Sequence, residues 1–174
     1  ATLPKMFFHD IFADRVGVVL AAIGEAAHHP KRFFVEVGVY NGSFALGILR
    51  NSRMGYLGVD PYSAAGGSFA DDAAGAAMHA AVAAELQEAA GGRAELRRTT
   101  SEAAASTLEA ADFVFVDGSH GFAPALQDLR TWWPRVRPGG LLFGHDFAAG
   151  LSDVVAALAT FSSEEGCSRA HLGL

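Results

Sequence analysis

Short apolar runs alternate with longer segments of helical character along most of the chain. The apolar runs are rich in β-branched and aromatic residues, which is typical of strands buried on both faces. They span 33–37, 55–60, 112–117 and 141–146, and a fifth, weaker and more polar strand is expected at 94–98. The segments between them carry apolar residues at helical spacing or are rich in alanine, the residue that favours helices most. These segments span 10–27, 43–50, 72–90, 101–110, 122–136 and 151–162.

This alternation predicts an α/β fold of the Rossmann-like, doubly wound type, with a mainly parallel sheet and helices on both faces. The length of 174 residues fits one domain, and no internal repeat or linker divides it. We expect residues 1–30 to form a helical N-terminal segment and residues 31–174 to form the sheet. The Pro-Gly-Gly sequence at 138–140 predicts a turn before the last apolar run, and the tail leaves room for one more strand.

Polar residues lie at or just after the ends of four of the five predicted strands. They are Glu36, Asp60, Asp117, His120, His145 and Asp146. Because the carboxyl ends of parallel strands meet at one edge of a sheet, we expect these side chains to face a common ligand. Burying so many ionisable groups without a use would be costly in free energy, so a ligand site is the economical interpretation.

The spacing of two glycines indicates the kind of ligand. Gly38 and Gly42 follow the run at 33–37 in the pattern E-x-G-x-x-x-G, and Asp60 comes 24 residues after Glu36. A dinucleotide-binding turn needs a third glycine, and the sequence has no phosphate-binding loop of the G-x-x-x-x-G-K type. A carboxylate at the end of the second strand suits the hydroxyls of a ribose. The pattern therefore favours a nucleoside without phosphates over NAD or ATP.

Four motifs in this order resemble the class I S-adenosylmethionine-dependent methyltransferases. They are VEVGVYNGS, LGVDPYS, DFVFVDGSH and RPGGLLFGHDF, and the resemblance covers roughly residues 33–160. The VDGSH motif, followed by PGG and GHD, is similar to a branch of small-molecule O-methyltransferases close to the macrolide-sugar methyltransferases and, more distantly, to the catechol type. The resemblance implies S-adenosyl-L-methionine as cofactor and a small-molecule acceptor that is methylated at a hydroxyl.

The resemblance also implies a role for each motif. The turn after 33–37 would hold the methionine part of the cofactor, Asp60 the ribose, and the two residues after Asp60 would flank the adenine. The residues after 94–98 would reach the adenine edge, and Asp117 would lie near the sulfonium. The cofactor-binding residues implied in this way are Glu36, Gly38, Tyr40, Asn41, Gly42, Ser43, Asp60, Pro61, Tyr62, Thr100, Ser101, Glu102 and Asp117.

Candidate catalytic groups follow the last two apolar runs. His120, three residues after Asp117, is a candidate general base because histidine titrates near neutral pH. Asp117 and Asp146 end neighbouring strands and, with His145, could share a divalent cation that lowers the pKa of the acceptor hydroxyl. Metal-dependent enzymes of this type resemble a D…D-N or D…E-D pattern, whereas this chain has Asp117…His145-Asp146. Mg²⁺, a softer divalent metal or no metal at all stay open.

Composition and charge limit the cellular compartment and the classes of partner that we expect. The net charge is −6 and no basic patch stands out, which argues against a nucleic-acid partner. No segment has the length and apolarity of a membrane span, and the N-terminus lacks the layout of a signal peptide. With a single cysteine, Cys167, we expect a reduced, cytoplasmic setting. Exposed sheet edges favour a homodimer as the protein partner.

Three alternatives stay open on the sequence alone. They are an NAD-type oxidoreductase, a non-catalytic cofactor-binding protein of the same fold, and methyl transfer to nitrogen or carbon. We expect the acceptor to be recognised by the N-terminal segment and by the loops at 62–71 and 147–152. His9, within the aromatic stretch MFFHDIF, is expected to dock by hydrophobic contact rather than to cover the acceptor.

Overall fold

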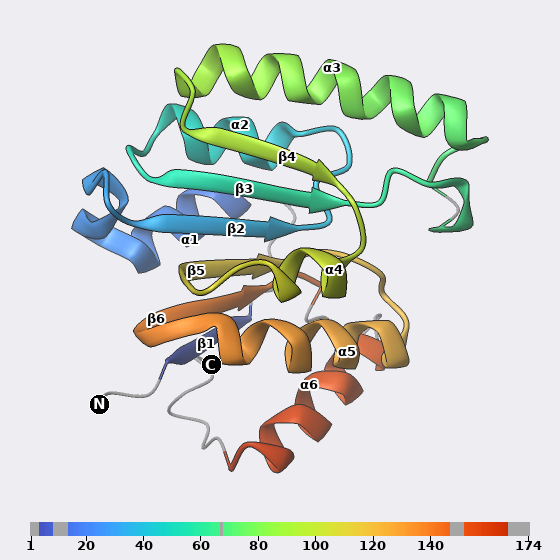
Figure 1. Cartoon of the computed structure of the whole chain (residues 1–174). Helices are drawn as coiled ribbons and strands as arrows, with labels where there is room; N and C mark the ends of the chain where they lie inside the picture. The colour runs from blue at the N-terminus through green and yellow to red at the C-terminus, as the bar shows by residue number, and fades with distance from the viewer. Residues whose placement is uncertain (1–3, 9–13, 67, 147–151, 167–174) are drawn as a thin grey trace.

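The computed structural model describes residues 4–8, 14–66, 68–146 and 152–166. Within these ranges the strands form one sheet in the order β1-β6-β5-β2-β3-β4, and all neighbours are parallel (Figure 1). The strands are β1 (Lys5–Phe8), β2 (Phe33–Val37), β3 (Gly55–Asp60), β4 (Ala94–Arg98), β5 (Ala111–Val116) and β6 (Val136–Gly144). The predicted α/β class with a parallel sheet is confirmed.

Helices cover both faces of the sheet (Figure 1), as the doubly wound pattern predicts. The helices α1 (Arg15–Ile23), α2 (Ser43–Arg50) and α3 (Asp72–Ala90) pack on one face. The helices α4 (Ser101–Ser106), α5 (Phe122–Trp132) and α6 (Ser152–Glu164) pack on the other. Short 3₁₀ turns span Gly24–His28, Ala64–Gly66 and Trp133–Arg135. Among the described helices, none combines the length and the apolarity that crossing a bilayer requires.

The core divides into two apolar clusters because side chains alternate along the central strands. In β2, Phe34 packs on the side of α1–α3 and Val35 on the side of α4–α6, and Phe113 and Val114 of β5 divide in the same way. Successive side chains of a strand point to opposite faces, so a strand covered on both faces needs a continuous apolar run. The continuous apolar runs therefore correspond to the buried strands β2, β3 and β5, whereas β4 is largely half-buried or exposed.

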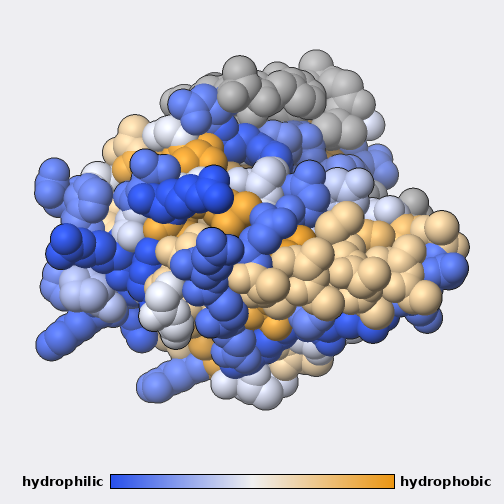
Figure 2. All heavy atoms as spheres, turned by 90° about the horizontal axis from the view of Figure 1, so that it is seen from above, coloured by the Kyte–Doolittle hydropathy of each residue, from blue (hydrophilic) through white to orange (hydrophobic). Residues whose placement is uncertain are grey.

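The helix α3 is held against the molecule by a narrow stripe of side chains. Its buried residues are Gly75, Val82, Leu86 and Ala90. Figure 2 looks down on this side and shows much of the helix as a band of weakly apolar residues, its alanines. Alanine stabilises a helix without needing burial, so this segment is helical although its amphipathic pattern is weak.

The strand β1 does not follow from the sequence pattern. Lys5–Phe8 pairs in parallel with Leu141–Gly144 of β6 and covers one edge of that strand. The apolar run at 6–8 is too short to separate a strand from a docked loop by periodicity. The expectations for His9, Cys167, the loop at 147–151 and the tail after 166 concern residues outside the described ranges.

The expectation of a turn at 138–140 is wrong. β6 begins at Val136 and runs through these residues. The pairing of β5 with β6 shifts register between Ala111 and Phe113, beside this stretch. Irregular pairing of this kind accommodates proline and glycine, since a ladder hydrogen bond is lost there anyway. Pro138, Gly139 and Gly140 can be recognised in the sequence as residues that disfavour a strand. That β6 pairs with β5 on both sides of them is visible only in the structure.

Candidate active site

A cavity of about 490 Å³ lies at the carboxyl ends of β2 and β5. The strand order reverses there, because β3 and β4 follow β2 on one side while β5 and β6 lie on the other. Loops leave such a switch point in opposite directions and open a crevice for a ligand. Small-molecule sites usually measure roughly 300–1,000 Å³, so the cavity has a suitable size.

Most of the sequence-predicted cofactor residues line this cavity. They are Glu36, Gly38, Tyr40, Asn41, Ser43, Asp60, Pro61, Thr100, Ser101 and Asp117. The candidate base His120 lines it as well. Gly42, Tyr62 and Glu102 are not among the residues that the structure places in the cavity wall. The topology therefore brings together segments that lie far apart in the chain.

Both glycines of the turn after β2 are required by close packing of the protein on itself. Gly38 has a φ of +88°, and a Cβ there would lie 2.1 Å from the carbonyl oxygen of Asp117. Gly42 has a φ of +75°, and a Cβ there would lie 2.7 Å from Cγ1 of Val82 in α3. Only glycine adopts this backbone region without a steric cost. The close approach at Gly38 thus joins the loops after β2 and β5, which form two walls of the cavity.

Asp60 organises the turn after β2. Its Oδ2 accepts the backbone N–H groups of Val39 at 3.0 Å and Tyr40 at 2.9 Å. Its Oδ1 accepts the N–H of Tyr62 at 2.7 Å. A carboxylate offers about four acceptor positions, so these bonds leave room for about one further donor. Because Asp60 lines the cavity, that position suits one ligand hydroxyl rather than two.

Glu36 is deeply buried in the wall of the cavity. Its side chain is only 2% exposed, and its Oε2 accepts the hydroxyl of Tyr56 at 2.6 Å. Burial raises the pKa of Glu36 well above its ordinary value, and the nearby charge of Asp117 adds to the increase. Burial also raises the pKa of the Tyr56 hydroxyl, so Tyr56 stays a hydrogen-bond donor to Glu36. A cationic ligand would relieve the cost of ionising Glu36.

Acidic side chains outnumber basic ones around the cavity. The acidic residues are Glu36, Asp60, Asp117 and Asp128. Arg15 of α1 also lines the cavity and forms an ion pair with Asp117. Its guanidinium carbon lies 5.9 Å from the ring centroid of Phe44, within the range of a cation–π contact. The surplus of carboxyl groups in a partly enclosed space favours a positively charged ligand.

Two of the residues expected near the adenine do not face the cavity. Tyr62 is fully buried, and its ring lies 5.7 Å from that of Phe69 and 5.4 Å from that of His79. Burial raises the pKa of its hydroxyl, which has no hydrogen-bond partner among the described residues. Glu102 is exposed in the first turn of α4. Phe69, whose ring lies 5.9 Å from that of Tyr40, lines the cavity and offers an aromatic surface there.

Backbone hydrogen bonds place the polar ends of β5 and β6 side by side. The N–H of Asp117 donates to the carbonyl of Val37 at 2.8 Å, and the N–H of His145 donates to that of Val116 at 3.2 Å. Nδ1 of His145 lies 2.9 Å from Oδ1 of Asp146 and 3.5 Å from Oδ1 of Asp117. The hydrogen bond to Asp117 and the charges of both carboxylates raise the pKa of His145 to about 9. His145 is therefore cationic at neutral pH and pairs with both.

A second histidine, His120, also lies close to Asp117 and Asp146. Its Nε2 lies 2.6 Å from Oδ2 of Asp146. One ligand atom each from Asp117, His120 and Asp146 lie within 4.8 Å of one another, a spacing that a metal ion could bridge. The sequence-based set has His145 in place of His120 and stays a prediction. One imidazole and two carboxylates suit Zn²⁺ or Fe²⁺ better than Mg²⁺, which prefers oxygen ligands.

Two ionisable residues of the cavity escaped the sequence-based prediction. Asp128 of α5 is 8% exposed, and burial raises its pKa from 3.8 to about 6. The sequence places Asp128 on the apolar face of the helix with Ala125 and Trp132. An acidic residue is rarely buried there without a partner or a function, and this could have identified it. Arg15 left no comparable signal, because a single basic residue at the start of a helix is common.

A family model for methyltransferase domains matches residues 35–147, which is more than half of the chain. The match runs from β2, through the turn that contains Gly38 and through Asp60 at the end of β3, to the polar end of β6. The chain belongs to the methyltransferase domain family. The resemblance to the class I S-adenosylmethionine-dependent methyltransferases is thereby confirmed, whereas the similarity to the macrolide-sugar branch stays a prediction.

Several solved methyltransferase structures share the fold. An O-methyltransferase from Bacillus cereus in complex with SAH is 13% identical with a TM-score of 0.66, over 92% of this chain and 72% of that one. A precorrin-6y C5,15-methyltransferase from Geobacter metallireducens is 13% identical with a TM-score of 0.61, over 92% and 75%. A methyltransferase from Geobacter sulfurreducens in complex with S-adenosyl-L-homocysteine is 15% identical with a TM-score of 0.53, over 78% and 49%. No curated protein matches the chain.

Proposed function

We propose that this methyltransferase moves the methyl group of S-adenosylmethionine to a hydroxyl of a small-molecule acceptor. The observation that carries the proposal is the acidic cavity at the switch point, where Gly38, Asp60 and Asp117 meet. The donor is a nucleoside without phosphates, so its ribose suits Asp60, and its sulfonium charge suits the surplus of carboxyl groups. When bound, it supplies an electrophilic methyl carbon. The fold is shared with an O-methyltransferase and a second methyltransferase, both solved with the demethylated product, which supports the assignment.

We assign each part of the donor to one section of the cavity wall. The turn at 38–43 holds the methionine part, because Gly38, Tyr40 and Asn41 line the cavity beside Glu36. Asp60 accepts a hydrogen bond from one ribose hydroxyl. Pro61 and Phe69 flank the base, and Ser101 lies at its edge. This arrangement keeps the expected contacts of the first two strands and replaces Tyr62 with an aromatic ring that faces the cavity.

His120 removes the proton of the acceptor hydroxyl in this proposal. Its side chain is 55% exposed and lines the cavity, so an acceptor can reach it from solvent. Asp146 engages Nε2, which leaves Nδ1 to take the proton while the Asp146 carboxylate stabilises the resulting imidazolium. An aliphatic or sugar hydroxyl is a very weak acid, so a base beside it accelerates its attack on the methyl carbon.

A divalent metal held by Asp117, His120 and Asp146 is the alternative way to activate the hydroxyl. It would supply Lewis-acid chemistry and lower the pKa of the acceptor. The two roles of His120 exclude each other, because an imidazole bound to a metal through one nitrogen keeps its proton on the other. The Asp117 carboxylate already has the charges of Arg15 and His145 beside it, which favours the role of His120 as base.

Isothermal titration of the protein with S-adenosylhomocysteine and, separately, with NAD tests donor binding. We expect about one molecule of S-adenosylhomocysteine per chain and no heat with NAD. Lack of binding by both S-adenosylmethionine and S-adenosylhomocysteine would overturn the proposed function, and binding of NAD instead would favour an oxidoreductase. The NMR chemical shift of the transferred methyl group in a methylated acceptor distinguishes transfer to oxygen from transfer to nitrogen or carbon.

Titration with Co²⁺, followed by its visible absorption, tests the metal. The variants are His120→Ala and His145→Ala, and His28→Ala is the matched control because His28 is exposed in the 3₁₀ turn after α1. Loss of Co²⁺ binding in His120→Ala alone supports the geometric set, and loss in His145→Ala alone supports the sequence-based set. If wild type does not bind Co²⁺, His120→Ala is expected to lower kcat while the affinity for S-adenosylhomocysteine stays unchanged, as a base requires. An unchanged kcat would show that His120 is not the base, whereas binding of S-adenosylhomocysteine without any turnover in wild type would favour a non-catalytic protein.

A further inference from the structure

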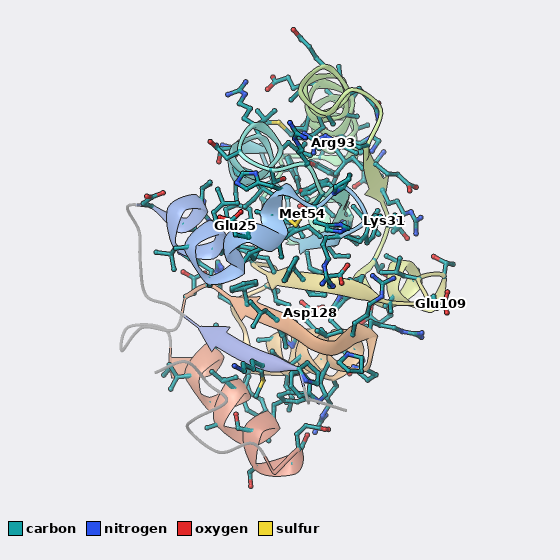
Figure 3. The ribbon with its side chains drawn as sticks, turned by 90° about the vertical axis from the view of Figure 1, so that its left-hand side faces the viewer. Glu25, Lys31, Met54, Arg93, Glu109 and Asp128 are labelled. Carbon is teal, nitrogen blue, oxygen red and sulfur yellow. The ribbon has the colours of Figure 1, made fainter. Side chains whose placement is uncertain are left out.

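A line of hydrogen bonds from α5 and α4 ends at a carboxylate in the cavity wall. Nε1 of Trp132 donates to Oγ of Ser101 at 2.8 Å, and the Ser101 hydroxyl bonds to the side chain of Asp128. A hydroxyl has one proton, so Ser101 donates it to the carboxylate of Asp128 and accepts from the indole. Trp132 is fully buried and Asp128 lies inside the molecule (Figure 3). The orientation of this carboxylate is therefore fixed before any ligand binds.

The Asp128 carboxylate also has access to the cavity. Asp128, Ser101 and Gly118 all contribute to its wall. A Cβ at Gly118 would lie 3.0 Å from Oδ2 of Asp128, so glycine at this position keeps the approach to that oxygen open. A carboxylate has about four acceptor positions, and the bond from Ser101 uses one. A nearly buried acid with spare acceptor capacity gains most from a ligand that brings a hydrogen-bond donor.

We propose that Asp128 selects the base of the nucleoside donor by accepting a hydrogen bond from its exocyclic amine. This inference rests on the proposed function, which assigns the ribose to Asp60 at the end of β3. The base then extends toward Ser101, which follows the neighbouring strand β4 and bonds to Asp128. Adenine presents an amine to such an acceptor. Hypoxanthine presents a carbonyl oxygen in its place, which would meet the carboxylate with no proton between them.

This role differs from a purely structural one. If Asp128 served only to tie α5 to α4 through Ser101, its replacement would change stability and would weaken all nucleoside ligands alike. A specificity-determining acceptor changes the preference between two bases that have the same size and shape. The ratio of two dissociation constants therefore separates the two roles.

Isothermal titration of the whole chain with S-adenosylhomocysteine and S-inosylhomocysteine measures this ratio. Asp128→Asn is the test variant, because it keeps the shape and offers an amide N–H to the carbonyl of hypoxanthine. Glu109→Gln is the matched control, since it removes an acid that is exposed at the surface (Figure 3). We expect wild type and the control to prefer the adenine ligand by about tenfold or more, and Asp128→Asn to lose or reverse that preference.

Each result decides the inference. A wild-type preference near one, or an unchanged preference in folded Asp128→Asn, overturns the role of Asp128. If circular dichroism shows that Asp128→Asn does not fold, Ser101→Ala is the second variant. It removes the bond that orients the carboxylate and is expected to lower the preference, and an unchanged preference overturns the role. Failure of wild type to bind S-adenosylhomocysteine would refute the proposed function itself, whereas binding without preference refutes only this inference.

Discussion

The buried carboxyl of Asp128 predicts an unusual pH dependence of stability in the ligand-free protein. Burial is the main cause that raises the pKa of Asp128 from 3.8 to about 6, and the charge of Glu102 adds to it, while the hydrogen bond from Ser101 works in the opposite direction. A carboxyl whose pKa is higher in the folded state binds its proton more tightly when folded. Its contribution to stability is present at low pH and is lost as the pH rises through about 6.

Asp128→Asn removes this ionisation, and linkage gives the size of the effect. A shift from 3.8 to about 6 corresponds to roughly 3 kcal/mol of lost stability once the carboxyl is fully ionised. Between about pH 4.5 and about pH 7.5 the loss amounts to roughly 2 kcal/mol, because part of it lies at lower pH. The free energy of unfolding of Asp128→Asn minus that of wild type should therefore rise by this amount over the interval.

Urea unfolding at a series of pH values, followed by circular dichroism, measures this difference directly. For a chain of this length the same change corresponds to roughly 4–8 °C in Tm. Glu109→Gln serves as control, because an exposed acid should give a difference that stays flat with pH. A flat difference for Asp128→Asn, or one that falls as the pH rises, would show that the carboxyl is not desolvated as the structure indicates.

Three further substitutions test the packing and the hydrogen bonds that support the site. Gly38→Ala places a Cβ 2.1 Å from the carbonyl oxygen of Asp117 and should lower the Tm by several degrees; a wild-type Tm would contradict this packing. Asp112→Ala removes a 2% exposed carboxylate that accepts bonds from two arginines and one backbone N–H, and should cost about 2 kcal/mol or more in urea unfolding without changing ligand affinity. Tyr56→Phe removes the hydroxyl that donates to Glu36 and should cost about 1–3 kcal/mol at neutral pH, and an unchanged free energy of unfolding would mean that Glu36 finds another donor.

The polar strand ends could be predicted because each follows a continuous apolar run. Glu36, Asp60 and Asp117 line one cavity as the sequence indicates, since parallel strands bring their carboxyl ends to a common edge. Tyr62 could not be predicted in the same way. Its N–H bonds to Asp60 and its φ is +45°, so the backbone turns and the ring packs beside His79 of α3. Adjacency in the sequence suggested a ligand contact that the turn removes.

For the histidines at the strand ends, the sequence predicts their presence at the site but not their partners. His145 and Asp146 follow β6 directly, so their presence at the site follows from the sequence. The partner of each histidine depends on side-chain geometry, which places Nδ1 of His145 near both aspartates and Nε2 of His120 on Asp146. Spacing alone could not decide which imidazole joins the two carboxylates at metal-binding distance.

The sequence by itself determined the alternation of buried strands and helices, the parallel sheet and the acidic, glycine-containing edge on which the site is built. These features depend on local periodicity and composition, which a linear pattern records. Only the tertiary structure decided that Arg15 pairs with Asp117, 102 residues away, and that Trp132 orients Asp128 through Ser101, 31 residues from Trp132. Such contacts arise from the packing of elements that are distant in the chain, and the geometry of that packing fixes which groups meet.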